Sequence, residues 1–172
     1  VPVSKKEPWS SDENLLHISY EAGELEDPAR KPRDSMYKLT KPVKSIKSNG
    51  SKVTVDFVEG IPVAINGKKM SPANLLREAN RLGFNNGVGR IDIVESRFVG
   101  MKSRGIYETP GGSILLAAHR DLETMCVNRD LLNTKNQLAV RFSQMAYNGF
   151  WFCEEMDALM AFLKSSQQHV TG

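Results

Sequence analysis

Two stretches of alternating apolar and polar residues, on either side of a glycine turn, restrict the fold more than any other feature of this sequence. Apolar side chains occupy every second position in 53–57 and again in 61–65, and Glu59-Gly60 lies between the two stretches. A period of two residues is that of a β-strand, so this arrangement predicts a β-hairpin. Asn66-Gly67 supplies a turn signal that ends the second strand.

A helix is predicted directly after the hairpin. Ser71-Pro72 provides an N-cap residue followed by proline at the first helical position. Apolar side chains continue at helical spacing up to residue 82, and Gly83 is a suitable C-terminal stop. We expect this helix, residues 72–82, to lie across a sheet.

The segment after this helix predicts more extended structure. Residues 90–94 are rich in isoleucine and valine, as in a buried strand, and we extend this strand to residue 98. Gly100 and Gly105 are expected to break the following segment into short extended pieces, which end at Pro110-Gly111-Gly112.

From residue 113 onward the pattern is helical. Leucine, methionine and phenylalanine recur on one helical face in each of three successive segments, and Glu154-Glu155 and Lys164 suit the two ends of the last helix. We interpret these stripes as packing surfaces, part of them against another subunit. The expected fold class is therefore α+β: a small antiparallel or mixed sheet (53–58, 61–65 and 90–98) with a packed helix, followed by a helical oligomerisation arm.

The 172 residues suit one domain, which we divide into a polar loop region (1–50), a sheet region (51–110) and the helical arm (111–172). The basic run between residues 30 and 52 contains only one aromatic residue, so it predicts a solvated loop rather than a nucleic-acid surface. No apolar run is long enough to span a bilayer, which argues against a membrane partner. Cys126 and Cys153 are expected to be buried free thiols of a cytoplasmic protein.

Two segments concentrate residues that can carry chemistry. Residues 8–19 hold three hydroxyls, two acids and an amide, which could form helix caps and turns or a hydrogen-bonding wall for a polar small molecule. Residues 87–110 mix glycines with many charged side chains, among them Asp92, Glu95, Arg97, Lys102, Arg104 and Glu108. A structural ion-pair network and a binding site for a zwitterion need the same mixture, so these residues leave both interpretations open.

A phosphate-binding loop of the GxxxxGK[ST] type is missing from the sequence, as is the Ser-Gly-Gly loop of adenylating enzymes. Gly111-Gly112-Ser113 could present backbone amides to an anion at a helix start, although paired glycines are common there.

Both segments resemble argininosuccinate synthases. The stretch GVGRIDIVESRFVGMKSRGIYETPGG closely resembles one part of that family, PWSSDENLLHISYEAGELEDP resembles a second part in the same order, and the similarity extends over essentially the whole chain. The resemblance implies an enzyme that ligates citrulline to aspartate with ATP and magnesium, through a citrullyl-AMP intermediate, releasing AMP and pyrophosphate in arginine biosynthesis. It also implies a homotetramer.

The resemblance further implies which parts of that enzyme this chain contains. Nothing in it is similar to the family's N-terminal nucleotide-binding domain, and it begins with Val1, so we expect a portion that follows this domain and stops before most of the C-terminal tail. The isolated chain is then expected to be inactive, with ATP bound mainly by the missing domain. The alternative is a non-catalytic oligomerisation module.

Four citrulline-binding residues of the family carry over to this sequence. The two serines of the first segment match Ser10 and Ser19, the glutamate after Ile-Asp-Ile-Val matches Glu95, and the tyrosine of Gly-Ile-Tyr-Glu-Thr-Pro matches Tyr107. By this resemblance Glu95 binds the α-ammonium group of citrulline, and the other three provide hydrogen bonds. No catalytic, metal-binding or nucleotide-binding residue is expected in the chain.

Overall fold

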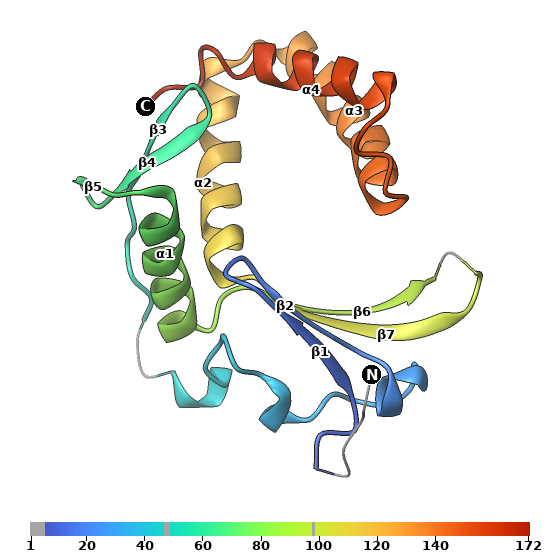
Figure 1. The fold of residues 1–172 in the computed structure, drawn as a ribbon. Helices are drawn as coiled ribbons and strands as arrows, with labels where there is room; N and C mark the ends of the chain where they lie inside the picture. Colours follow the sequence, from blue (N-terminus) through green and yellow to red (C-terminus); the bar gives the residue numbers. More distant parts are fainter. Residues whose placement is uncertain (1–5, 47–48, 98) are drawn as a thin grey trace.

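The computed structural model describes residues 6–46, 49–97 and 99–172 (Figure 1). The described chain forms two separate antiparallel sheets and four α-helices, which confirms the α+β class. Lys47 of the basic run and Phe98 at the end of the predicted third strand lie outside the described residues. None of the helices in the described ranges is long and apolar enough to cross a bilayer.

The larger sheet has four strands in the order β1-β2-β7-β6, all antiparallel. One of its faces covers an apolar core that includes Ile18, Tyr20 and Ile106, each with an exposed fraction of 2% or less. The strands are β1 (Ser10–Glu13), β2 (Ile18–Glu21), β6 (Arg90–Ser96) and β7 (Lys102–Glu108).

The prediction that residues 1–50 are irregular was therefore wrong in part. Strands β1 and β2 lie in this region, followed by the short 3-10 helices Gly23–Glu26, Asp34–Met36 and Val43–Ser45. The buried Ile18 and Tyr20 alternate with Ser19 and Glu21, which is a strand pattern of only four residues. A strand this short becomes stable only through its pairing with β7, about 90 residues later in the chain.

The smaller sheet contains the predicted hairpin. Strands β3 (Val55–Val58) and β4 (Ile61–Ile65) pair through the Glu59-Gly60 turn, and β5 (Lys68–Lys69) adds after the turn at Asn66-Gly67. All four turn residues have positive φ, the backbone conformation of two-residue hairpin turns.

Helix α1 (Pro72–Asn86) packs on this smaller sheet, with proline at its start as predicted. Its predicted end at Gly83 was wrong. Gly83 is buried inside the helix, where an added Cβ would lie 2.5 Å from Pro110 Cβ, so the missing side chain permits close helix packing. The helix ends instead at Gly87, which has the left-handed conformation of a C-terminal cap.

The prediction of a single sheet was also wrong, because the third predicted strand belongs to the larger sheet. Strand β6 forms a hairpin with β7, which itself pairs with β2 and therefore cannot reach β3 or β4. The strand is at the sheet edge and is largely exposed rather than buried, with Ile91, Ile93 and Val94 open to solvent. Gly105 does not break the extended segment, since it lies in the middle of β7.

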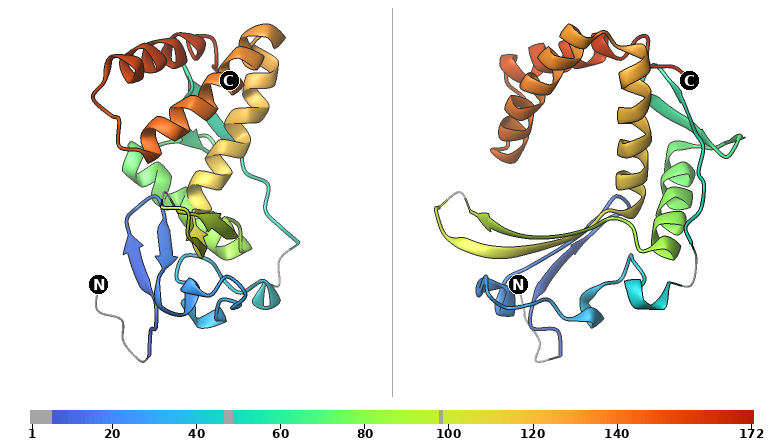
Figure 2. Two further views of the ribbon diagram at one scale, coloured as in Figure 1. Left: turned by 90° about the vertical axis from the view of Figure 1, so that its right-hand side faces the viewer. Right: turned by 180° about the vertical axis from the view of Figure 1, so that it is seen from behind.

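Three helices form the arm: α2 (Pro110–Cys126), α3 (Arg129–Tyr147) and α4 (Glu154–Ser166). Helix α2 begins at Pro110, three residues earlier than predicted, and α3 returns from its far end toward β6 and β7 (Figures 1 and 2). A small core of Met145, Met156 and Leu159 joins α3 to α4. The arm also exposes many large apolar side chains: Leu116, Met125, Val140, Tyr147, Phe150, Trp151, Phe152 and Met160.

The last residues of the chain return to the smaller sheet. The backbone N–H groups of Phe57 and Gly172 each donate to the other residue's carbonyl oxygen, at 2.8 and 3.1 Å, and Gly60 N–H donates to the Val170 carbonyl at 2.8 Å. Val170 is fully buried. This clip of residues 170–172 against the edge of β3 fixes the far end of the arm to the sheet.

Both cysteines are free thiols, as predicted, but they are partly rather than fully buried.

Candidate functional site

The strand register places all four predicted site residues on one face of the larger sheet. Ser19 pairs with Tyr107 across β2 and β7, and Ser10 pairs with Glu21, two residues after Ser19. Glu95 is an even number of residues from Ile91, which pairs with Tyr107. Paired residues share a face and alternate residues return to it, so these four side chains lie opposite the apolar core.

Glu95 and Tyr107 are in direct contact on this face. Tyr107 Oη donates a hydrogen bond to Glu95 Oε1 at 2.7 Å, and both side chains are half-buried. Burial, together with the Glu95 carboxylate, raises the pKa of Tyr107 well above its ordinary value. The phenol therefore stays protonated and donates to Glu95 throughout the physiological pH range. Glu95 has no ion-pair partner among the described residues, which leaves its charge available to a ligand.

Gly105 makes this contact possible. It lies on the same strand face, two residues before Tyr107, and a Cβ there would be 2.3 Å from Glu95 Oε1 and 2.9 Å from Tyr107 Oη. Any side chain at this position would therefore occupy the space in which the two groups meet. This role was not predicted from the sequence, although a glycine within a strand, two residues before a tyrosine, is a signal for it.

A pocket of about 350 Å³ opens beside the Glu95–Tyr107 pair. Ser10 and Ser19 do not line it, although each is paired across the sheet with a residue that does. Ser10 is also buried. The structure thus brings Glu95 and Tyr107 together, places Ser19 beside them, and leaves Ser10 further across the sheet. The pocket is lined by Glu21, Glu95, Arg97, Val99, Tyr107 and Tyr147.

Arg97 contributes the positive charge of this pocket. Its guanidinium donates to Ser103 Oγ at 3.0 Å and to Glu26 Oε1 at 3.2 Å, and lies 3.7 Å from Glu21 Oε2. These contacts hold the turn after β6 against the segment after β2. Arg97 thereby fixes the position of the strand end that carries Glu95.

The opposite face of the sheet holds a separate set of charges. Arg104 makes two hydrogen bonds to Asp92 and two more to the carbonyl oxygens of Pro28 and Arg30. These contacts tie the loop after Glu26 to the sheet. The charges of residues 87–110 thus divide by strand face. The Arg104–Asp92 ion pair lies on the core side, and the candidate site lies on the other side together with the ion pairs of Arg97.

Glu108 lies on the same core-side face, and its side chain is fully buried. Its carboxylate accepts hydrogen bonds from Tyr20 Oη at 2.7 Å, from the backbone N–H groups of Lys38 and Leu39, and from the Thr40 hydroxyl. A buried carboxylate is tolerated only when hydrogen bonds replace its water. Glu108 is therefore a structural residue that fixes the loop around Leu39 beneath β7.

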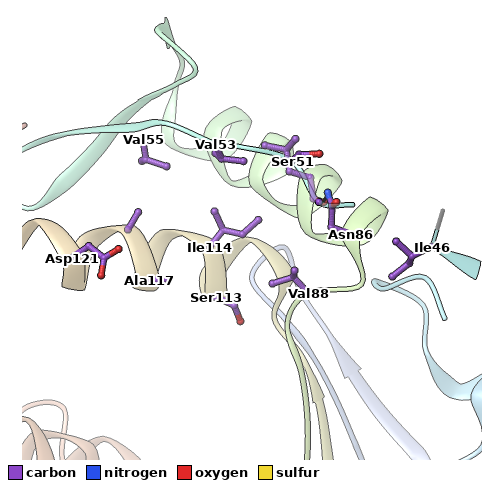
Figure 3. A pocket seen from close by; sticks show the side chains of 13 residues that line it. Ile46, Ser51, Val53, Val55, Asn86, Val88, Ser113, Ile114, Ala117 and Asp121 are labelled. Atoms are coloured by element: carbon purple, nitrogen blue, oxygen red, sulfur yellow. Dashed lines mark hydrogen bonds between the residues drawn. The ribbon is translucent and has the colours of Figure 1, made fainter. Parts of the chain in front are cut away.

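A larger cavity, of about 520 Å³, lies elsewhere, between α2 and the segment that leads into β3 (Figure 3). Its walls are mainly apolar: Val53 and Val55 lie along one segment and face Ile114 on α2, and Asp121 lies at one end. None of the four predicted site residues lines it.

The possible anion site at Gly111-Gly112-Ser113 is partly occupied by the protein itself. The N–H group of Gly111 donates to Asn80 Oδ1 at 2.8 Å, and that of Ser113 donates to the Thr109 carbonyl at 2.9 Å. The bond from Gly111 to Asn80 fixes the start of α2 against α1.

Known proteins are similar to this chain over its whole length, including the two segments that carry the candidate site. A family model described as the arginosuccinate synthase C-terminal domain matches residues 9–172. The argininosuccinate synthase of Syntrophotalea carbinolica is 51% identical over 172 residues, covering 100% of this chain and 42% of that protein. Those of Desulfatibacillum aliphaticivorans and Nitratiruptor sp. are 47% and 49% identical over the whole chain, which covers 43% of each. This chain therefore spans less than half the length of these relatives, and it belongs to the argininosuccinate synthase family, in which it corresponds to the C-terminal domain.

Proposed function

We propose that this chain is the citrulline-binding and assembly portion of a cytoplasmic argininosuccinate synthase. The observation that carries the proposal is the Glu95–Tyr107 pair, which lines a pocket on the same sheet face as Ser10 and Ser19. In the proposed reaction, the ureido oxygen of citrulline attacks the α-phosphorus of Mg²⁺-bound ATP and pyrophosphate leaves. The amine of aspartate then displaces AMP from the activated carbon. The nucleotide is bound by a part of the enzyme outside this chain.

The contribution of this chain to the reaction is positioning. The Glu95 carboxylate, held by Tyr107 Oη at 2.7 Å, binds the α-ammonium of citrulline, and the hydroxyls of Tyr107, Ser19 and Ser10 complete a polar surface. Anchoring the amino-acid end of citrulline fixes the direction in which its ureido end points. Orientation of this kind can lower a reaction barrier by several kcal/mol.

Substitution of Glu95 in the full-length enzyme tests this assignment. Glu95→Gln keeps the shape but removes the charge that faces the ammonium, a charge-assisted hydrogen bond worth roughly 1.5–3 kcal/mol. We expect citrulline affinity to fall about ten- to a hundredfold, while the KM for ATP stays unchanged. Tyr107→Phe removes one hydrogen bond and should have a smaller effect on citrulline.

Steady-state kinetics and a thermal melt of each variant separate binding from stability. A Glu95→Gln enzyme with an unchanged citrulline KM would contradict the assignment of Glu95 to citrulline. An equal loss of affinity for citrulline and ATP, together with a lower melting temperature, would show that Glu95 has a structural role. The isolated chain should release no pyrophosphate from ATP, citrulline and aspartate, because its sequence carries no phosphate-binding loop.

A second role, as an assembly module, is favoured by the exposed apolar side chains of the arm. Phe150, Trp151 and Phe152 follow one another between α3 and α4, and all three are open to solvent. Clusters of large exposed apolar residues mark surfaces that are covered by a partner. We assign this surface to contacts with other copies of the chain in a homo-oligomer.

A further inference from the structure

One wall of the candidate site comes from the arm rather than from the sheet. Five of the six residues that line the pocket belong to the larger sheet or to the turn after β6. The sixth is Tyr147, the last residue of α3, which is 40 positions after Tyr107 in the chain. Figure 1 shows the end of α3 directed toward β6 and β7. The pocket therefore lies between two parts of the fold that are far apart in sequence.

The position of Tyr147 is fixed by its own helix. Met145, two residues earlier, is buried against Met156 and Leu159 of α4. Residues two positions apart in an α-helix point in nearly opposite directions, so Tyr147 points away from this small core. Its side chain has an exposed fraction of 67%, and no hydrogen bond to its hydroxyl is present within the described part of the chain. The phenol group is thus an unused hydrogen-bond donor on the wall of the pocket.

The charges of the pocket indicate which group of a ligand could meet this donor. Glu21 and Glu95 bring two carboxylates to the sheet side, and Arg97 is already engaged by Glu21, Glu26 and Ser103. The sheet side therefore attracts the ammonium end of an amino acid. A neutral donor on the opposite wall suits the carboxylate of the same ligand, because a phenol can donate to an anion without an ion-pair partner.

We propose that Tyr147 is a further ligand-binding residue of this site, which closes the pocket over the amino-acid end of the substrate and donates its hydroxyl to a carboxylate oxygen. The proposal rests on the assignment of citrulline to this pocket. It has one consequence for the enzyme as a whole. The residue that closes the site belongs to the arm, so any contact that holds the arm in place also maintains the pocket.

The experiment uses the full-length enzyme with Tyr147→Phe, Tyr147→Ala and Glu95→Gln, and measures the KM of citrulline, aspartate and ATP for each. Tyr147→Phe removes one neutral hydrogen bond and should raise the citrulline KM about two- to tenfold, with little change in the KM of ATP. Tyr147→Ala also removes the ring that covers the pocket and should raise the citrulline KM further. Because Tyr147 is largely exposed, neither substitution removes a core residue.

Gln144→Ala is the matched control. Gln144 is an exposed polar residue of α3, about one turn before Tyr147, and it does not line the pocket. This variant should leave the citrulline KM unchanged. Light scattering on every variant shows whether the assembly state has stayed the same.

The outcomes separate the inference from the proposed function. An unchanged citrulline KM in both Tyr147 variants, with a raised KM in Glu95→Gln, overturns the role of Tyr147 and leaves the citrulline site in place. A raised KM for all substrates together with an altered particle mass makes Tyr147 an assembly residue and also overturns the inference. An unchanged citrulline KM in Glu95→Gln overturns the citrulline assignment itself, and with it the proposed ligand of Tyr147.

Discussion

Gly105 shows how much of a site can depend on a residue without a side chain. Glu95 and Tyr107 lie on neighbouring strands, but they are not directly opposite each other, since Glu95 pairs with Ser103 and Tyr107 with Ile91. The tyrosine ring therefore has to extend along its own strand, over Gly105, to reach the carboxylate. The position of the Glu95 carboxylate thus depends on the absence of a side chain at Gly105.

The substitution Gly105→Ala should disrupt the site with little loss of stability. Its new methyl group would lie 2.3 Å from Glu95 Oε1, so the Tyr107–Glu95 hydrogen bond has to break. We expect a citrulline KM raised about tenfold in the full-length enzyme, in the range of a lost charge-assisted hydrogen bond, and a melting temperature near that of the wild type. Ile93→Ala, at the position paired with Gly105, is the control. A Gly105→Ala enzyme with normal citrulline kinetics would show that the Tyr107–Glu95 hydrogen bond is dispensable.

The sequence predicted the four site residues through family resemblance, but not their arrangement. Residue chemistry alone left a zwitterion site and an ion-pair network equally possible for residues 87–110. The fold separates the two sets of side chains, because alternate residues of β6 and β7 face opposite sides. The assignment of each residue to a face requires the register of β7 with β2, which no local pattern specifies. Tyr147 could not be connected with Tyr107, because α3 reaches the pocket only through the packing of the arm.

The three helices of the arm meet at Glu123, which has an exposed fraction of 2%. Its carboxylate on α2 accepts hydrogen bonds from Lys135 Nζ on α3 and, at 2.9 Å, from Gln167 Nε2 at the end of α4. His119 lies one turn before it on α2, with Nε2 2.8 Å from Gln167 Oε1 and its ring edge-on to Phe57. One buried acid therefore connects all three helices and lies next to the edge of the smaller sheet.

This junction should weaken in acid. Burial alone would raise the pKa of Glu123, but the hydrogen bonds from Lys135 and Gln167 outweigh it and lower the pKa below its ordinary value. A carboxyl whose folded pKa is depressed stabilises the fold above its unfolded pKa, and this contribution is lost as pH falls through the folded value. Glu123→Gln should therefore melt at a lower temperature than the wild type at pH 7, and the difference should narrow below about pH 4.

Thermal melts of both proteins between pH 7 and pH 3 measure this effect. Glu155→Gln is the control, because Glu155 pairs with Arg141 on the surface, where both side chains are about half exposed. Exposed ion pairs contribute little, so this variant should melt close to the wild type at every pH. A constant difference between Glu123→Gln and the wild type across the whole range would show that protonation of Glu123 does not control the junction.

Elements formed by local interactions were predicted correctly, whereas elements formed by distant pairing were not. The hairpin of β3 and β4 depends on neighbouring residues and two turns, and α1 depends on its own periodicity and its proline start. The larger sheet depends on β2 pairing with β7, and its short strands carry too few residues to produce a clear pattern. Gly83 was misinterpreted for the same reason, since the need for a glycine arises from Pro110, which only the fold brings close.

At the scale of the whole molecule, the arm exposes several large apolar side chains to solvent. Phe152 is fully exposed, and Met125 is nearly so. The exposed apolar residues of the arm lie on its helices or on the α3–α4 connection, and the two sheets also expose apolar residues such as Ile61 and Ile91. The oligomerisation role of the arm stays a prediction, and further copies of the chain are the partner that we propose.

We expect the protein to be larger than a monomer in solution, by light scattering at micromolar concentration. The double substitution Phe150→Ser and Phe152→Ser should shift the measured mass toward that of one chain. The reason is that both apolar side chains are expected to be buried between copies of the chain. Ile61→Ser, at an exposed position on the smaller sheet, should leave the mass unchanged. A wild-type monomer, or an oligomer unaffected by the arm substitutions, would contradict assembly through this surface.

The clip between residues 170–172 and β3 attaches the arm to the rest of the fold at both of its ends. One end of the arm is attached where α2 continues from β7, and the other is attached by the backbone bonds of Gly172 and Val170 to Phe57 and Gly60. Closing a loop removes conformational freedom that an arm attached at one end would keep. The arm can swing away from the sheets only if this short ladder opens first. The amide protons of Phe57 and Gly60 therefore exchange with solvent at a rate that reports how often the arm is released.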